Sequence, residues 1–95
     1  MVKYSNIDDI YSSLSDATRR DILLKISAGS LDLSSIAKDN KISLPAVSKH
    51  LKVLEKANLI ERKKVGREYQ FTLKEAAKYW IRQFENLERF LKKRS

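Results

Sequence analysis

Basic and small polar side chains share the stretch from residue 43 to residue 56. Wound as a helix at about 100° per residue, this stretch separates its side chains onto two faces. One face holds Val47, Leu51 and Leu54, and the other holds Pro45, Lys49, Lys52 and Lys56. Ser48 and Ala46 are small and flank Lys49, so they permit close approach to base edges. This spacing of ammonium groups favours a polyanion, and a helix fits the major groove of DNA.

The two halves of this helix predict different contacts with DNA. Ser43, Ser48 and Lys49 lie in the N-terminal half, where base edges come within reach. The lysines further along are expected to bind phosphates, which fix register without reading sequence. The predicted DNA-binding residues of this helix are Ser43, Leu44, Pro45, Ala46, Ser48, Lys49, His50 and Lys52.

A second basic cluster follows the helix. Residues 59–65 and 68–72 are rich in strand-forming side chains and flank a Gly66-Arg67 turn, which predicts a β-hairpin. The basic residues around its tip, predicted to lie along the DNA backbone or in the minor groove, are Arg62, Lys63, Lys64 and Arg67. Without this hairpin, the helix lysines would read as the solvated side of an ordinary amphipathic helix. A basic wing beside a basic helix favours DNA binding instead.

The net charge of +8 is confined to the second half of the chain. Residues 1–42 carry six basic and six acidic side chains, whereas residues 43–73 and 74–95 each carry seven basic and three acidic ones. The surplus therefore begins at the predicted helix, as expected of a binding face.

Length and composition exclude several classes of protein. The 95 residues predict one domain, residues 1–95, with too small a core for a two-lobed enzyme. The chain has no cysteine and one histidine, and its paired carboxylates Asp8 and Asp9 diverge by about 100° on a helix. We therefore predict no catalytic site, no metal and no cofactor. Neither a membrane span nor a signal peptide is visible, so we expect a cytoplasmic, nucleoid-associated protein.

The remaining sequence predicts helices that would support these two basic elements. Apolar periodicity and capping residues predict helices over about 6–14, 17–27, 33–40 and 43–57, and a long one over about 73–93. Asp8 and Asp9 are expected near the start of the first helix, and Gly29 and Asn58 are expected to end helices in the left-handed conformation. The predicted fold is mainly α with a small β-hairpin wing: a winged helix-turn-helix in the order helix, helix, helix, helix, strand, strand, helix.

The long last helix carries a heptad seam. Its apolar residues, at spacings of four, three, four, three and four, are Leu73, Ala77, Trp80, Phe84, Leu87 and Leu91. Such a seam fits core packing, but a terminal helix that projects past a small domain favours pairing with a second copy. The aromatic residues of this helix, Tyr79, Trp80, Phe84 and Phe90, could alternatively line an effector pocket between subunits; interface packing is the favoured interpretation.

Paired motifs resemble the ArsR-type family of winged-helix repressors over about residues 6–93. They are the segment from Leu14 to Leu23 with its Asp-Ala-Thr-Arg-Arg core, the segment from Ser43 to Leu54, and Gly66-Arg67-Glu68-Tyr69. Ala17 replaces the family's proline, and Leu44 replaces its glutamine. The resemblance implies a homodimeric repressor on an inverted-repeat operator, with the first and last helices forming the interface. The interface residues this implies are Ile7, Ile10, Tyr11, Ala77, Trp80, Phe84, Leu87 and Leu91.

The metal-sensing residues of many family members are missing. Asp32 and Ser34 occupy the positions of the family's Cys-x-Cys pair, and the last helix has no histidine. The chain therefore resembles the subgroup without metal sensing, and its effector is unknown. His50 is expected to be structural or to contact phosphate.

Three functions remain open from the residues. Sequence-specific operator binding by a repressor is favoured over a non-specific architectural DNA-binding protein, for which the +8 charge would suffice. The third is a winged-helix module that binds protein partners.

Overall fold

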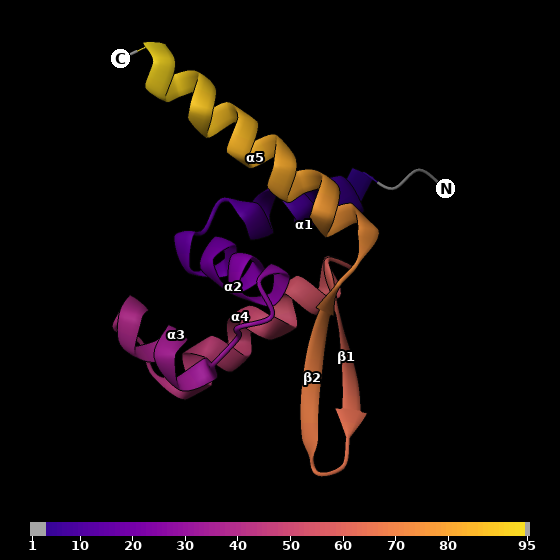
Figure 1. Ribbon diagram of the computed structural model, residues 1–95. Helices are drawn as coiled ribbons and strands as arrows, with labels where there is room; N and C mark the ends of the chain where they lie inside the picture. Colours follow the sequence, from indigo (N-terminus) through magenta and orange to yellow (C-terminus); the bar gives the residue numbers. More distant parts are fainter. Residues whose placement is uncertain (1–3, 95) are drawn as a thin grey trace.

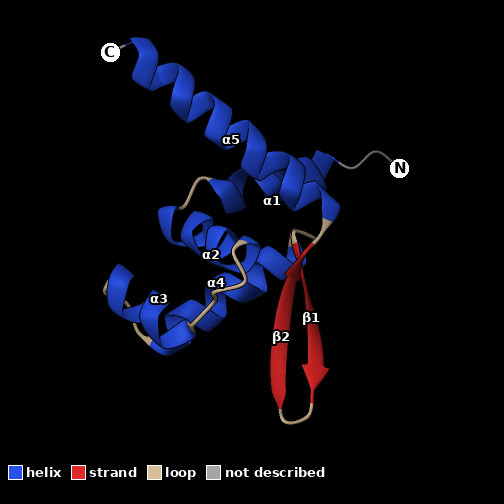
Figure 2. Cartoon of the chain, viewed as in Figure 1, coloured by secondary structure: helices blue, strands red, loops and turns tan. Residues whose placement is uncertain are grey.

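The computed structural model describes residues 4–94, which form five helices and one hairpin (Figures 1 and 2). The elements in chain order are α1 (Tyr4–Leu14), α2 (Ala17–Ser27), α3 (Leu33–Asn40), α4 (Leu44–Lys56), β1 (Ile60–Val65), β2 (Glu68–Leu73) and α5 (Glu75–Arg94). The predicted fold class, mainly α with a β-hairpin wing, is confirmed.

Side-chain caps begin three of the helices. A carboxylate oxygen of Asp16 accepts from the Arg19 backbone N–H, and one of Asp32 accepts from that of Ser34, at 3.0 and 3.1 Å. Ser43 Oγ accepts from the Ala46 N–H at 3.2 Å, with Pro45 in the first turn of α4. These bonds satisfy donors that the helix itself leaves unpaired.

Residues in the left-handed conformation end α2, α3 and α4. Gly29 follows α2 at φ 69°, Lys41 ends α3 at φ 57°, and Asn58 follows α4 at φ 65°. After α4, the Asn58 N–H donates to Glu55 O and the Leu59 N–H donates to Leu54 O. This pair of bonds is a Schellman motif, which turns the chain sharply from α4 into the wing.

Two predicted boundaries differ from the structure. The last helix begins at Glu75 rather than about residue 73, because Leu73 pairs with Ile60 and is still part of β2. The first helix begins at Tyr4, ahead of its apolar stripe, so Asp8 and Asp9 lie beyond its first turn, which contains no acidic residue. The expected interaction of these carboxylates with the helix start is therefore wrong.

The hydrophobic core lies among the first four helices and the base of the wing. Its most deeply buried side chains are Leu14, Ile22, Leu23, Ile36, Val47, Leu54, Leu59 and Ile60. α5 contributes the buried Ala77 and then Trp80, Ile81 and Phe84 at the edge of the core. Figure 1 shows the hairpin extending away from the helices on one side and the C-terminal half of α5 projecting on the other. No helix within residues 4–94 is long and apolar enough to span a membrane.

Candidate nucleic-acid interface

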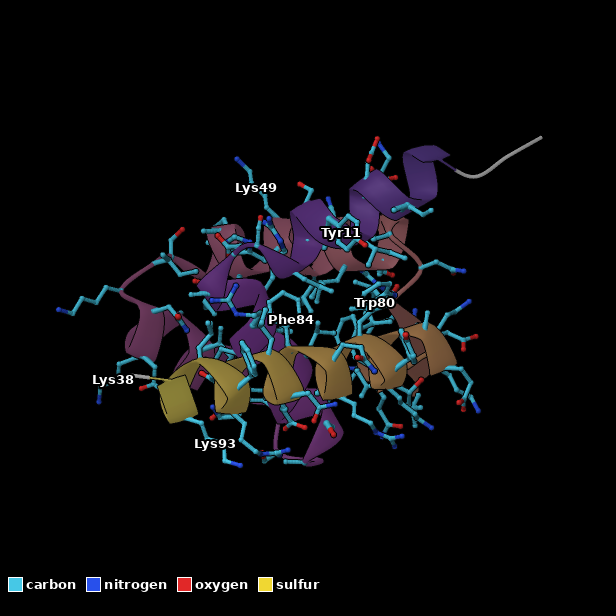
Figure 3. All side chains as sticks on the ribbon, turned by 90° about the horizontal axis from the view of Figure 1, so that it is seen from above. Tyr11, Lys38, Lys49, Trp80, Phe84 and Lys93 are labelled. Carbon is cyan, nitrogen blue, oxygen red and sulfur yellow. The ribbon has the colours of Figure 1, made fainter. Side chains whose placement is uncertain are left out.

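The two faces of α4 are separated as the sequence predicts. Val47, Leu51 and Leu54 are at most 2% exposed, whereas Lys49 and Lys52 lie on the exposed side. Figure 3 shows Lys49 projecting from the side of the molecule opposite to α5. Packing of the apolar face against α2 and α3 therefore holds the lysines outward, where a DNA groove could receive them.

The N-terminal turn of α4 is exposed. Leu44 is 50% exposed, and Ser43, Pro45 and Ser48 are also on the surface, while Ala46 is half-buried. The cap leaves the Ser43 hydroxyl proton free to donate to another acceptor. Leu44 is aliphatic, so it could touch a thymine methyl but cannot hydrogen-bond a base.

His50 is held by a side chain that sequence reasoning did not connect with it. Its Nδ1 lies 3.0 Å from Arg19 Nη1, and 3.9 Å from Asp16 Oδ2. The imidazole is 21% exposed. From the sequence alone, one of Arg19 and Arg20 is expected to pair with a carboxylate such as Asp16. In the structure the Arg19 backbone N–H donates to Asp16, whereas the Arg19 guanidinium bonds to α1 and α4. Sequence offers no local signal for a pair 31 positions apart.

The wing presents three cations near its tip. Lys63 and Lys64 pair with Gln70 and Tyr69 across the hairpin, and Arg67 lies in the turn beside Gly66, whose φ is 64°. All three are exposed, and none forms an ion pair with a carboxylate of the described chain. They are therefore available to phosphates.

Arg62 lies at the base of the wing and has a different environment. Its Nε and Nη2 donate to the two carboxylate oxygens of Glu55 on α4, at 3.0 and 2.6 Å. The guanidinium also stacks over the rings of Tyr69 and Phe71, 4.9 and 5.5 Å from their centroids. Hydrogen bonding to Glu55 raises the pKa of Arg62 further above its ordinary value. Predicted as a DNA contact, Arg62 in the structure links β1 to α4.

The predicted dimer residues divide into two groups. Ile7, Tyr11, Leu87 and Leu91 are between 45% and 57% exposed, and Trp80 and Phe84 are half-buried. Ile10 and Ala77 belong to the core of the single chain, and Ala77 has no exposed surface. Because Ile10 and Ala77 are buried within the single chain, the prediction that they contact a second subunit is revised.

Aromatic contacts join α1 to α5. The ring of Trp80 on α5 meets that of Tyr11 on α1 edge to face, with centroids 5.5 Å apart (Figure 3). Within α5, the rings of Tyr79 and Trp80 also meet edge to face, at 5.2 Å. A separate groove of about 310 Å³ runs between α2 and α5. Of the four aromatic residues considered for an effector pocket, only Phe84 lines this groove.

The start of α3 does not resemble a thiolate metal site. Asp32 is committed to capping: its carboxylate accepts from the Ser34 N–H and the Ser35 hydroxyl. Across residues 4–94, no three His, Asp or Glu side chains converge as metal ligands.

These features define a winged helix-turn-helix DNA-binding protein. The profile of the bacterial regulatory protein, arsR family, matches residues 16–62. The transcriptional repressor SdpR of Bacillus subtilis is 31% identical over 67 residues, 70% of this chain and 74% of the repressor. The chain belongs to the ArsR family and is a transcriptional regulator, not an enzyme.

Two further relatives extend the comparison. The HTH-type transcriptional regulator Rv2034 of Mycobacterium tuberculosis is 42% identical over 60 residues, which is 63% of this chain and 56% of that protein, little more than half its length. The solution structure of the homodimeric winged helix-turn-helix domain Mb0332 from Mycobacterium bovis superposes with a TM-score of 0.79. It covers 96% of this chain and 85% of that domain at 16% identity, so this likeness concerns the fold.

Proposed function

We propose that this regulator is a homodimeric repressor that binds an inverted-repeat operator through α4 and the tip of the wing. The observation that carries the proposal is the pairing of two exposed cationic elements. Lys49 and Lys52 on α4 and Lys63, Lys64 and Arg67 on the wing are all exposed. Repression is supported by the likeness to SdpR, which is named a transcriptional repressor.

Within this proposal the cations have separate tasks. Ser48 and Lys49 read base edges in the major groove, because they lie in the N-terminal half of α4 on its exposed side. Lys52 and the wing cations bind phosphates and set the register of the complex. Each phosphate contact releases counterions, so affinity should fall steeply as salt rises.

The second subunit is proposed to cover the exposed apolar side chains of α1 and α5. Ile7 and Tyr11 on α1 and Leu87, Phe90 and Leu91 on α5 are each about half exposed, and apolar side chains that are exposed together favour an interface. The related domain from Mycobacterium bovis is described as homodimeric. A two-fold dimer places two α4 helices in successive major grooves and thereby selects an inverted repeat.

Control by a metal is not part of the proposal. The chain contains no cysteine, and its one histidine is engaged with Arg19. An operator-binding regulator acts where the chromosome lies, so we propose the cytoplasm and association with the nucleoid as its location.

The test is selection of bound genomic fragments by the purified protein at about 150 mM salt, with the protein's own upstream region included. Enrichment of one inverted repeat with half-sites roughly 10 to 11 base pairs or a multiple apart supports the proposal. Broad enrichment without a motif, which disappears as salt rises, would identify a non-specific architectural protein instead. Absence of any saturable complex at low salt would point to a protein-binding module.

A further inference from the structure

The guanidinium of Arg19 joins two helices that are separate in sequence. Its Nε donates to Ser13 O at 2.9 Å and its Nη2 donates to Ser12 O at 3.0 Å, both in the last turn of α1. Its Nη1 donates to His50 Nδ1 at 3.0 Å, in the middle of α4. One side chain from α2 therefore bridges the end of α1 and the DNA-facing helix.

Both ends of this bridge suit a guanidinium. The carbonyls of the last turn of a helix carry partial negative charge and have no partner within the helix, so a cation there is favourable. Because arginine has donors only, His50 Nδ1 must be the acceptor, which leaves the proton of the neutral ring on Nε2. The bridge thus fixes the tautomer of His50 as well as its place.

The neighbouring arginine makes a contrasting contact. Arg20 also donates to the end of α1, from Nη1 to Leu14 O at 2.6 Å, and its guanidinium lies 5.6 Å from the centre of the Phe84 ring. No hydrogen bond joins Arg20 to α4 within the described residues. The two arginines carry the same charge and donate to the same end of α1, but of the two only Arg19 also donates to α4.

We propose that Arg19 is a positioning residue for DNA recognition, which acts by holding His50 and with it the rotation of α4 relative to α1. Lys49 is adjacent to His50, so a small rotation of α4 moves the ammonium group of Lys49 across the major groove of DNA. The proposal rests on the proposed function, since it assigns the way α4 is presented to DNA. It further makes α1, which carries Ile7 and Tyr11, a route by which subunit pairing influences α4.

The bridge itself can be tested without DNA. The chain has a single histidine, so a long-range ¹H–¹⁵N spectrum of the imidazole is unambiguous. We expect an unprotonated Nδ1 and a protonated Nε2 in the wild-type protein near neutral pH, and a mixture of tautomers in Arg19→Gln. A wild-type Nδ1 that carries the proton would overturn the proposal.

The effect on DNA binding is tested with matched variants on a fragment that the wild-type protein binds saturably. Arg19→Gln and Arg20→Gln remove the same charge from the same region. We expect Arg19→Gln to weaken binding by roughly 10-fold, the scale of one charge-assisted hydrogen bond, and Arg20→Gln to weaken it far less. Equal weakening by the two variants would mean a general charge effect and would overturn the proposal.

A double-mutant cycle shows whether Arg19 acts through His50. Arg19→Gln combined with His50→Ala should bind no more weakly than His50→Ala alone, because the same link is broken in both. Additive losses, or a smaller salt slope in Arg19→Gln, would mean that Arg19 contacts DNA independently.

His50→Asn keeps an acceptor at the position of Nδ1 and should retain most of the affinity, whereas His50→Gln should not. The reverse order would assign His50 a direct contact through Nε2 and contradict the positioning role. If the wild-type protein binds no fragment saturably, the proposed function fails, and the imidazole spectrum still decides whether the bridge exists.

Discussion

Exchanging the charges of Glu55 and Arg62 tests whether the wing is oriented by its link to α4. The single variants are Glu55→Gln and Arg62→Gln, and the double variant is Glu55→Arg with Arg62→Glu. The double variant restores an ion pair of reversed polarity between the same two backbone positions. If Arg62 orients the wing through Glu55, the double variant should recover the DNA affinity that the single variants lose. If Arg62 contacts DNA directly, the double variant should not recover it.

The geometry of the pair gives the size of the effect. The pair is bidentate at 3.0 and 2.6 Å, and the Arg62 and Glu55 side chains are 33% and 27% exposed. A partly exposed pair of good geometry contributes about 1 kcal/mol to the free energy of unfolding. Stacking of the guanidinium on Tyr69 and Phe71 adds about 0.5 to 1 kcal/mol. We expect Arg62→Gln to lower the free energy of unfolding by about 1.5 kcal/mol and Glu55→Gln to lower it by about 1 kcal/mol. The double variant with exchanged charges should lower it by less than Arg62→Gln does.

Urea unfolding measures these stabilities, and titration of DNA at several salt concentrations measures affinity and its salt slope. Glu55→Gln raises the net charge and Arg62→Gln lowers it, yet both should weaken binding to a similar degree, with an unchanged salt slope. The reasoning is refuted if Glu55→Gln binds as well as or better than wild type while Arg62→Gln lowers the slope by about 0.9, the value for one phosphate that is no longer neutralised.

Four further outcomes are expected. Lys49→Ala should weaken operator binding without changing the urea midpoint, whereas Lys38→Ala on α3 should leave binding intact; equal reductions in affinity would contradict the assignment of α4. Leu51→Ala should lower the free energy of unfolding by about 2 to 5 kcal/mol, because a side chain that is 2% exposed leaves a cavity, and a change below about 1 kcal/mol in urea unfolding would contradict its place in the core. The pKa of Asp21 is lowered, chiefly by the hydrogen bond from the lysine four residues later, so the stability that Asp21 contributes is present above about pH 4 and disappears as pH falls through the depressed value. The difference in free energy of unfolding between wild type and Asp21→Asn should therefore shrink over that acid range in urea unfolding. A difference that does not change with pH would refute the assignment. Leu87→Glu should shift the proposed dimer toward monomer in sedimentation analysis, and an unchanged sedimentation coefficient would remove that residue from the proposed interface.

Local features of the fold could be predicted from the sequence. Ser43 and Pro45 define the start of α4, and Asn58 provides the left-handed exit. These signals act within a few residues, so capping and backbone preferences alone suffice to predict them. The apolar and basic faces of α4 follow equally from its periodicity.

Features that depend on tertiary packing could not be predicted in this way. Leu73 fits the heptad spacing, yet it belongs to β2 because Ile60 pairs with it across the hairpin. Ala77 fits the same spacing, yet it is buried in the core of the single chain. A repeat of seven specifies a helical face but not whether that face meets the core or a partner.

The two arginine links show the same limit for the site. The basic cluster in the sequence assigns Arg62 to DNA, although its partner Glu55 is only seven positions away. Arg19 meets His50 across 31 positions, through the packing of α2 on α4. Charge and spacing indicate which residues could bind an anion, and the fold decides which of them are already engaged within the protein.

The most direct test of the account is the ratio of two affinities, measured for the purified wild-type protein at about 150 mM salt. One DNA carries the selected inverted repeat, and the other is a scrambled fragment of the same length and base composition. Recognition by α4 and the wing predicts that the inverted repeat binds at least about 1,000-fold more tightly. A ratio near one would contradict sequence-specific operator binding, whatever the strength of either complex.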